Sequence, residues 1–326
     1  MLMPTDLIVA QPKNHAEIGA LVEIAHRASD FARQAKSENT VRAYQSDWSH
    51  FDSWCRIHGQ VALPATPETV GLYLADLSTT LKTGTLIRRT SAISQMHQIT
   101  GFESPTKSSQ VRLVMAGIRR TKGMSQTAKT PVLVDNLRRM VSHAPENLLG
   151  IRDRALLLIG FAGAFRRSEL VALDFADVVV SRDGLVVLIR RSKTDQDCEG
   201  RKVGIPYGSN PETCPVRALE DWLRQCGFTE GPLFRPVSRF SAVAPARLSA
   251  GAVAEIVKKY AAAVGLKAAE FAGHSLRSGL ATSAAMAGAS ERSIMAQTGH
   301  RSVNQLRRYI RDGSLFRDNA AGVVGL

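Results

Sequence analysis

The sequence predicts a mainly helical protein with two domains, an all-α N-terminal domain and an α+β C-terminal domain that contains a small antiparallel sheet. Apolar residues recur at helical spacing through residue 122, and no strand pattern interrupts them. A polar segment rich in Gly, Ser, Gln and Thr follows at 123–131 and has the composition of a linker. Beyond it, β-branched runs at 185–189 and 202–206 interrupt a second series of helices, which is typical of a hairpin.

The bulk composition favours a nucleic-acid partner. The chain has 326 residues, enough for two hydrophobic cores, and 42 Lys and Arg against 29 Asp and Glu give a formal net charge of +13. A surplus of this size favours a polyanion, of which nucleic acid is the commonest. The alternative is a basic protein whose charge serves only its solubility.

The cysteine pattern and the lengths of the apolar runs predict the cellular compartment of the protein. Cys55, Cys198, Cys214 and Cys226 form no C-x-x-C pair, so we expect plain thiols in a reducing compartment and no metal or other cofactor. No apolar run reaches the roughly 20 residues that a membrane span needs. The N-terminus does not resemble a signal peptide. We therefore expect a cytoplasmic protein, in the bacterial cytoplasm or nucleoid, without a membrane partner.

The N-terminal domain is expected to follow a flexible lead-in, residues 1–13, and to cover residues 14–122. A first helix starts near Asn14, where Glu17 completes a capping box. The second helix, Asn39–Gly59, ends at a glycine suited to the left-handed conformation. Its predicted buried stripe consists of Val41, Tyr44, Trp48, Phe51 and Cys55.

Three more helices complete this domain. Thr66 and Pro67 supply the N-cap and first-turn proline of the third, and the others are expected at Thr85–Thr100 and Ser108–Lys122. The residues expected to face inward are Val70, Tyr73, Leu74, Leu77, Leu86, Ile93, Met96, Val111, Val114, Met115 and Ile118.

Basic side chains gather on the polar faces of the last two of these helices. Such clusters are often only solvated surface, but here they lie on neighbouring helices that lead into the linker, which suits phosphate contacts. The predicted nucleic-acid surface comprises Arg42, Lys82, Thr85, Arg88, Arg89, Arg112, Arg119, Arg120 and Lys122.

The C-terminal domain, residues 132–326, is predicted to open with helices at Val134–His143 and Ile151–Phe165. A strand at Leu185–Ile189 follows the turn residues 182–184, and a returning strand covers Lys202–Pro206. Helices resume near Pro215–Gln225 and continue to the end.

Four short motifs carry residues suited to phosphoryl transfer. They are GAFRRSEL at 163–170, GHSLRSG at 273–279, TGH at 298–300, and a tyrosine nine residues after the last histidine. His274 and Arg277 are three apart, so they share a helix face and can meet one phosphate. Transfer onto a phenol needs a nucleophile, positive charge on the phosphate oxygens and an acid for the leaving oxygen. Taken singly, each residue is more often a core or capping group, and which of Arg166 and Arg167 faces inward stays open.

The ordered set of motifs resembles the tyrosine recombinase (phage integrase) family, of the Cre- and Xer-like kind. The resemblance implies an N-terminal core-binding domain at 14–122, a linker at 123–131, and a catalytic domain at 132–326 whose tail docks into a neighbouring protomer. It implies Tyr309 as nucleophile, with Arg166, Lys193, His274, Arg277 and His300 as further catalytic residues and Glu169 in support. Arg190, Arg191, Arg201 and Lys202 compete with Lys193 for the position of the hairpin lysine.

The same resemblance implies a reaction and an assembly. The enzyme is expected to cut and rejoin DNA through a 3′-phosphotyrosine and a Holliday junction, without metal or ATP. Its expected partner is double-stranded DNA with an inverted-repeat core site, bound by a homotetramer on two sites that is monomeric when free. Two alternatives stay open: a type IB topoisomerase-like enzyme, and a catalytically silent DNA-binding accessory protein.

Overall fold

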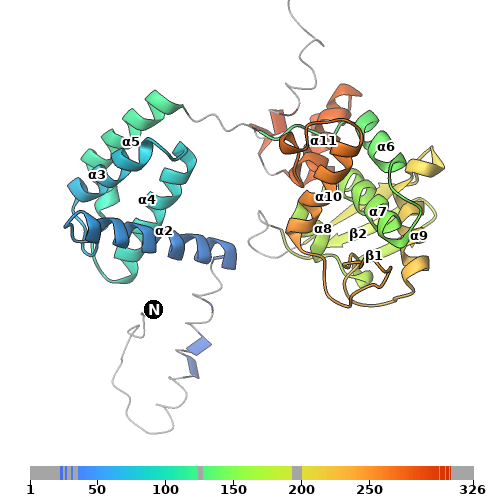
Figure 1. Cartoon of the computed structure of the whole chain (residues 1–326), viewed down its shortest axis with the longest axis horizontal. Helices are drawn as coiled ribbons and strands as arrows, with labels where there is room; N and C mark the ends of the chain where they lie inside the picture. Colours follow the sequence, from blue (N-terminus) through green and yellow to red (C-terminus); the bar gives the residue numbers. More distant parts are fainter. Residues whose placement is uncertain are drawn as a thin grey trace, which may run out of the picture. The chain divides into compact units, whose positions relative to one another are not determined.

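The structure, a computed structural model, describes residues 36–123, 128–192 and 200–300, together with positions 23–24, 26–27, 31, 302–304, 306–307 and 309. The lead-in, nearly all of the expected first helix, Lys193 and the tail after Tyr309 lie outside the described residues. The chain divides into two compact units, Met1–Thr127 and Ala128–Leu326, each of which is described by itself (Figure 1). Among the described residues, no helix is long and apolar enough to cross a membrane.

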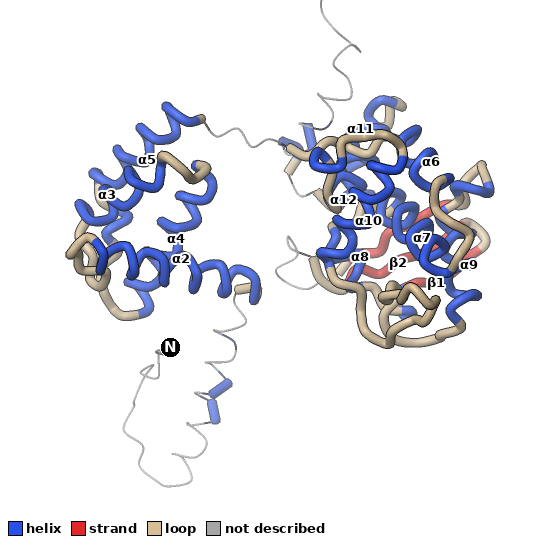
Figure 2. Tube along the Cα trace, in the orientation of Figure 1, coloured by secondary structure: helices blue, strands red, loops and turns tan. Residues whose placement is uncertain are grey.

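The N-terminal unit is built from helices α2 (Glu38–Ile57), α3 (Pro67–Ser78), α4 (Thr83–Ile99) and α5 (Ser109–Lys122), with a short 3₁₀ turn at Pro105–Lys107. Helix α2 packs mainly on α4, and α3 mainly on α5 (Figure 2). The side chains of Ser37, Thr66 and Ser108 cap α2, α3 and α5 by accepting hydrogen bonds from backbone N–H groups of the first turn. These caps explain why the helices begin where they do.

Most of the residues predicted to face inward form the core of this unit, including Phe51, Tyr73, Leu86 and Met115. The stripe predicted for α2 is wrong at Val41, which is exposed, and Tyr44 and Trp48 are only half-buried. Asp47 and Trp54 are buried instead. The indole N–H of Trp54 donates to Asp76 at 2.7 Å, and Asp47 binds two arginines of α4, so the polar atoms of both residues are satisfied in the interior.

The C-terminal unit confirms the predicted α+β class. Its helices are α6 (Val134–Ser142), α7 (Leu148–Ala162), α8 (Arg167–Ala172), α9 (Pro215–Cys226), α10 (Ala250–Ala263), α11 (His274–Met286) and α12 (Glu291–Thr298). The sheet consists of β1 (Val178–Ser181), β2 (Gly184–Ile189) and β3 (Arg201–Pro206), antiparallel in the order β1-β2-β3. Val186 pairs with Val179 on one side and with Gly204 on the other.

Helix α7 lies at the centre of this unit, beside α9 and α11 (Figure 1). Its second half, from Ala155 to Phe161, is apolar on all sides and buried, as expected of a helical segment with neighbours all round. The sheet buries one face against the same core, through residues such as Val187 and Ile205, and exposes Val186 and Leu188 on the other. The carboxyl end of α7 is therefore held by its neighbours on several sides, and the turn to α8 starts from this fixed position.

Candidate active site

The turn between α7 and α8 positions one of the two adjacent arginines. Ala164 adopts a left-handed conformation (φ 50°), which reverses the chain directly after α7. Arg166 is the N-cap of α8 in an extended conformation, and its N–H donates to Glu169 Oε2 at 3.0 Å. Its guanidinium Nη1 donates to Glu169 Oε1 at 2.5 Å and to Ser192 Oγ at 3.3 Å, whereas Arg167 is exposed. Arg166 is therefore the inward-facing arginine.

Helix α11 carries the second arginine into the interior. Arg277 is 1% exposed and donates from Nη1 to the carbonyl oxygen of Ala164 at 2.8 Å. Its Nη2 has no hydrogen-bond partner among the described residues. A Cβ at Gly279 would lie 2.0 Å from the carbonyl oxygen of Val132, so only glycine lets α11 approach the chain this closely. The sequence GHSLRSG thus both anchors the helix and buries its arginine.

The phenol of Tyr309 meets two imidazoles. The hydroxyl of Tyr309 lies 2.8 Å from His274 Nε2, and its ring centroid lies 5.8 Å from that of His300. His300 follows Gly299, which ends α12 in the left-handed conformation. His300 Nδ1 is 2.7 Å from the hydroxyl of the fully buried Thr298. Residues 35 positions apart thereby share one hydrogen bond.

Arg201 on β3 lies close to Arg166 and Glu169, although the sequence indicated it only as a competitor for the hairpin lysine. Its Nη2 lies 3.9 Å from Glu169 Oε2, and its Nη1 donates to the carbonyl oxygen of Gln297 at 3.1 Å. The amide of Gln297 in turn donates to Ala162 O at 2.7 Å and Gly204 O at 3.1 Å. Strand alternation was the available signal, because Arg201 has the same parity as the inward residues Val203 and Ile205.

The charges in the cluster are unbalanced. Arg166 and Arg201 share the carboxylate of Glu169, at 2.5 and 3.9 Å, and the charges of all three groups also act on the guanidinium of Arg277. Burial, and then the charge of Arg166, lower the pKa of Arg277 to about 10, which leaves it charged at neutral pH. Burial and the nearby arginines also lower the pKa of His274, and they lower that of His300 to about 4. The arrangement is a half-buried, net cationic site with two neutral imidazoles, and it is suited to an anion.

The lysine predicted from the hairpin lies outside the described residues, but its four competitors are described. Arg201 lies in the arginine cluster, and Arg191 is exposed. Arg190 binds Asp177 at 2.6 Å and Asp174 at 3.4 Å, away from the cluster. Lys202 is exposed and pairs with Leu188 on the outer side of the sheet. The assignment of Lys193 therefore stays a prediction.

The basic residues of the N-terminal unit fall into two groups. Arg42, Lys82, Arg112, Arg119 and Arg120 are exposed, and Thr85 is half-buried.

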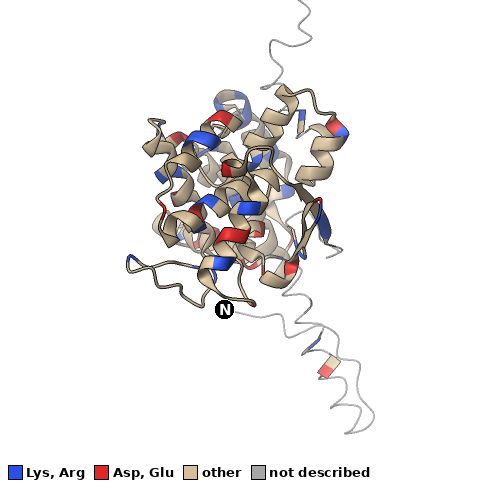
Figure 3. Ribbon diagram, turned by 90° about the vertical axis from the view of Figure 1, so that its right-hand side faces the viewer, with Lys and Arg blue, Asp and Glu red and all other residues tan. Residues whose placement is uncertain are grey.

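Arg88 and Arg89, in contrast, do not project freely as expected. Arg88 makes a two-point contact with Asp47 at 2.7 and 3.0 Å, and Arg89, 12% exposed, donates to Tyr73 Oη at 2.6 Å. Lys122 donates to the carbonyl oxygens of Ser78, the last residue of α3, and of Leu81, so it connects the end of α5 to the end of α3 and to the loop that follows. Figure 3, in which the C-terminal unit faces the viewer, shows acidic and basic residues interspersed along the helices of that unit.

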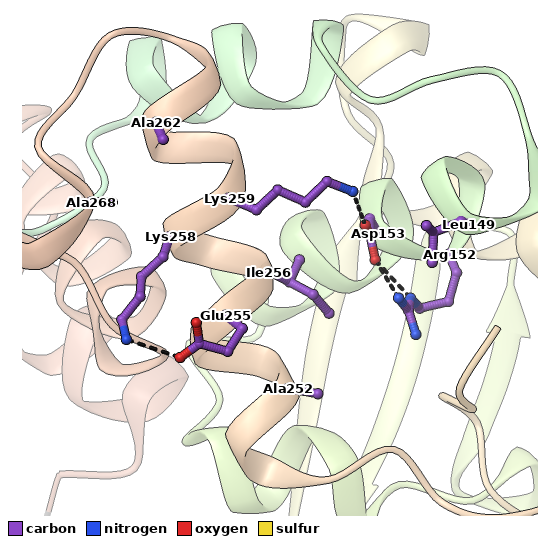
Figure 4. A pocket seen from close by; sticks show the side chains of 10 residues that line it. All are labelled: Leu149, Arg152, Asp153, Ala252, Glu255, Ile256, Lys258, Lys259, Ala262 and Ala268. Atoms are coloured by element: carbon purple, nitrogen blue, oxygen red, sulfur yellow. Dashed lines mark hydrogen bonds and ion pairs between the residues drawn. The ribbon is translucent and has the colours of Figure 1, made fainter. Parts of the chain in front are cut away.

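A hollow of about 640 Å³ lies between α7 and α10, and neither the arginines of the candidate site nor Tyr309 line it (Figure 4). Its buried charges are paired, because Asp153 accepts from Arg152 at 2.7 Å, from Lys259 at 3.3 Å and from Tyr260 at 2.9 Å. These contacts are those of a structural network rather than of a ligand site.

Within the described residues, no group of His, Cys, Asp and Glu has the arrangement to hold a metal ion.

Comparison with known proteins shows the family. Residues 132–314 match the phage integrase family. The chain is 44% identical over 291 residues to an integrase/recombinase xerD homolog of Selenomonas ruminantium, covering 88% of this chain and 85% of that protein. The XerH site-specific recombinase bound to a palindromic difH substrate shares the fold, with a TM-score of 0.65 at 16% identity over 99% of this chain and 93% of that one. A lambda integrase tetramer bound to a Holliday junction does so with a TM-score of 0.56 at 18% identity, over 87% and 75%. The chain therefore belongs to the phage integrase family of tyrosine recombinases.

Proposed function

We propose that this protein is a site-specific DNA recombinase that cuts and rejoins strands through a 3′-phosphotyrosine at Tyr309. The observation that carries the proposal is the contact of 2.8 Å between the hydroxyl of Tyr309 and His274 Nε2, beside two inward-facing arginines. A neutral imidazole can accept the phenol proton as the oxygen attacks phosphorus. The lowered pKa of His274, caused by burial and by Arg277 and Arg166, keeps that nitrogen available at neutral pH.

The reaction balances as a transesterification. The Oη–P bond forms while the bond from phosphorus to the 5′-oxygen breaks, and the leaving oxygen receives a proton, for which we propose Lys193 as donor. Arg166 and Arg277 hold the charge that builds on the non-bridging oxygens, with His300 as a third contact and Glu169 supporting Arg166. One ester replaces another of similar energy, so rejoining by a 5′-hydroxyl needs no ATP. We propose that the arginines supply the positive charge that a metal ion would otherwise supply.

The unused donor of Arg277 supports this assignment. A buried guanidinium normally satisfies all its donors, yet Nη2 of Arg277 finds no acceptor within the described parts of the chain. Guanidinium groups bind two oxygens of a phosphate at once. A phosphodiester oxygen is the acceptor that would complete this group.

We further propose the substrate and assembly of this reaction. The substrate is double-stranded DNA with an inverted-repeat core site, contacted by the exposed cations Arg42, Lys82, Arg112, Arg119 and Arg120, with Thr85 and Arg88 at the edge of that surface. We propose that Arg89 and Lys122 stabilise this surface, because Arg89 is bonded to the hydroxyl of Tyr73 and Lys122 to the carbonyl oxygen of Leu81. Four protomers would exchange strands through a Holliday junction in the bacterial cytoplasm, each docking the tail after residue 311 into its neighbour.

A covalent-trapping experiment tests the proposal. A duplex is first selected from a random-sequence library by the inactive Tyr309→Phe variant, and is then prepared with a nick that lets the cut end diffuse away. We expect the wild-type chain to form a covalent protein–DNA adduct on this duplex, and Tyr309→Phe to form none while binding equally well. Adducts on every duplex tested would indicate the topoisomerase-like alternative. Binding without any adduct would indicate the silent accessory protein.

A further inference from the structure

The hydroxyl of Thr298 stands between two polar groups and has a single proton to donate. Its Oγ1 lies 2.7 Å from the carbonyl oxygen of Ile294 and 2.7 Å from His300 Nδ1. A carbonyl oxygen can only accept a hydrogen bond, whereas an imidazole nitrogen donates or accepts according to its tautomer. The Thr298 proton must therefore point to Ile294, because two acceptors at 2.7 Å would repel each other. It follows that His300 Nδ1 is the donor toward Thr298.

This contact decides the state of the other ring nitrogen. A neutral imidazole carries one proton, so a proton on Nδ1 leaves Nε2 of His300 with a bare lone pair. The charged and aromatic groups that act on the ring come from several elements: Arg166 at the start of α8, Arg201 of β3, His274 and Arg277 of α11, and Tyr309, while Glu169 of α8 acts on the arginines. They are mostly cationic. In this state Nε2 of His300 can accept a hydrogen bond from a neighbouring cation, but it has no proton to donate to a phosphate oxygen.

We propose that Thr298 is a positioning residue that holds His300 as the Nδ1–H tautomer, so that Nε2 takes up one proton from solvent when a phosphodiester enters the site. The added proton lets Nε2 donate to a non-bridging oxygen, and the anion offsets the positive charge of the arginines. Burial and those arginines lower the pKa of His300 to about 4 in the free protein, so the ring is neutral before the anion arrives. An adjacent anion raises the pKa again.

This inference deepens the proposed function and has a consequence for binding. If one proton is taken up with each phosphodiester, affinity at this site must rise as the pH falls, by at most about tenfold per pH unit, since binding and protonation are linked. Arginine contacts alone would give no such dependence, because guanidinium groups stay charged throughout this range.

The tautomer can be read directly in the full-length chain labelled with ¹⁵N-histidine, in which protonated and bare ring nitrogens have different shifts. His300→Gln identifies the signals of His300. At pH 7 we expect protonated Nδ1 and bare Nε2 in the wild type and in Thr298→Ser, which keeps the hydroxyl. Thr298→Val removes the acceptor and should move the proton to Nε2 in part or in full. Thr282→Val, the same exchange at another buried threonine, should leave the His300 signals unchanged.

Proton uptake is tested with inorganic sulfate, a tetrahedral anion whose charge stays constant over this pH range. We expect sulfate to raise the pH midpoint of His300 by about one unit or more. Calorimetric titration of Tyr309→Phe with the selected duplex, in two buffers of different ionisation heat and at a pH between the free and bound midpoints of His300, should show net proton uptake of up to about one per protomer. A wild-type ring with its proton on Nε2, a Thr298→Val ring that keeps the proton on Nδ1, or a midpoint unmoved by sulfate would each overturn the inference.

Neither measurement depends on strand cleavage. If the Tyr309 adduct fails to form while the His300 signals behave as expected, the proposed function fails and the tautomer assignment stands. If the adduct forms but the His300 signals do not behave as expected, the proposed function stands and the tautomer assignment fails. Thermal melting of each variant, with Thr298→Ser as the conservative form, separates a loss of fold from a change of tautomer.

Discussion

At the start of α8, one carboxylate fixes the direction of one arginine. Glu169 accepts from both the backbone and the guanidinium of Arg166, while Arg167 remains exposed. The sequence showed two adjacent arginines and a glutamate at capping spacing. The resemblance to the family implied Arg166, but spacing alone could not show which arginine would be the N-cap, because that depends on where α8 begins. A shift of one residue would have exchanged their roles.

This difference predicts unequal effects of the same substitution. Arg166→Gln removes a cation from the cluster and should lower the rate of adduct formation by about 100-fold or more. Arg167→Gln removes an equal charge from the surface and should change that rate less than about threefold. Single-turnover trapping on the selected duplex measures both. Equal losses would show that net charge, and not position, governs the effect.

His300 makes stability depend on pH in a predictable direction. Its pKa of about 4 in the folded chain is below the ordinary value of 6.5, so the unfolded chain binds the proton first. Stability is therefore fully present above about pH 6.5 and is lost as the pH falls toward 4. Denaturant unfolding of the C-terminal unit across this range should show a steeper acid loss for the wild type than for His300→Gln. Parallel curves would contradict the prediction.

At the scale of elements, a buried ion pair joins α2 to α4. Asp47 is 3% exposed and contacts both Arg88 and Arg89, which lie about 40 positions further along the chain. Helical periodicity predicted α2 and most of its core side, since apolar spacing is a local property. It could not predict a buried aspartate, because the partner that makes the burial possible comes from another helix.

Removal of that carboxylate should destabilise the N-terminal unit. Asp47→Asn leaves two arginines without their buried counter-ion, and we expect a loss of about 3 kcal/mol in the free energy of unfolding. Asp52→Asn removes the surface pair with Arg56 on the same helix and should cost about 0.5 kcal/mol or less. Thermal or urea unfolding compares the two. A similar cost for both would mean that the Asp47 contacts add little.

At the scale of the whole molecule, the site draws on distant segments. The motifs around Arg166, His274 and His300 were each visible in the sequence, and their common order indicated the family. Arg201 was considered only as a competitor for the hairpin lysine, and Thr298 only as the first residue of the TGH motif, without a role of its own. Their roles depend on contacts across the C-terminal unit, with Glu169 and Gln297, and on the direction of a single hydroxyl proton.

The proposed assembly predicts a separation of activities. A chain that ends at Arg311 keeps the residues of both compact units that we assign to DNA contact and to the phosphate. We expect it to bind a single site with affinity close to that of the full chain, while recombination between two sites falls by at least about tenfold. Gel-shift and recombination assays on the selected duplex measure the two. Full recombination by the shortened chain would refute tail docking between protomers.

The carboxyl end of α7 has a further consequence for Arg277. Carbonyl groups at this end receive the amide of Gln297 at Ala162 and the guanidinium of Arg277 at Ala164. Such a terminus bears the partial negative charge of the helix dipole without bearing an ion. The helix end can therefore stabilise the guanidinium of Arg277 in the interior and still leave the full positive charge of Arg277 for an incoming phosphate. A carboxylate paired with Arg277 would already have cancelled most of that charge.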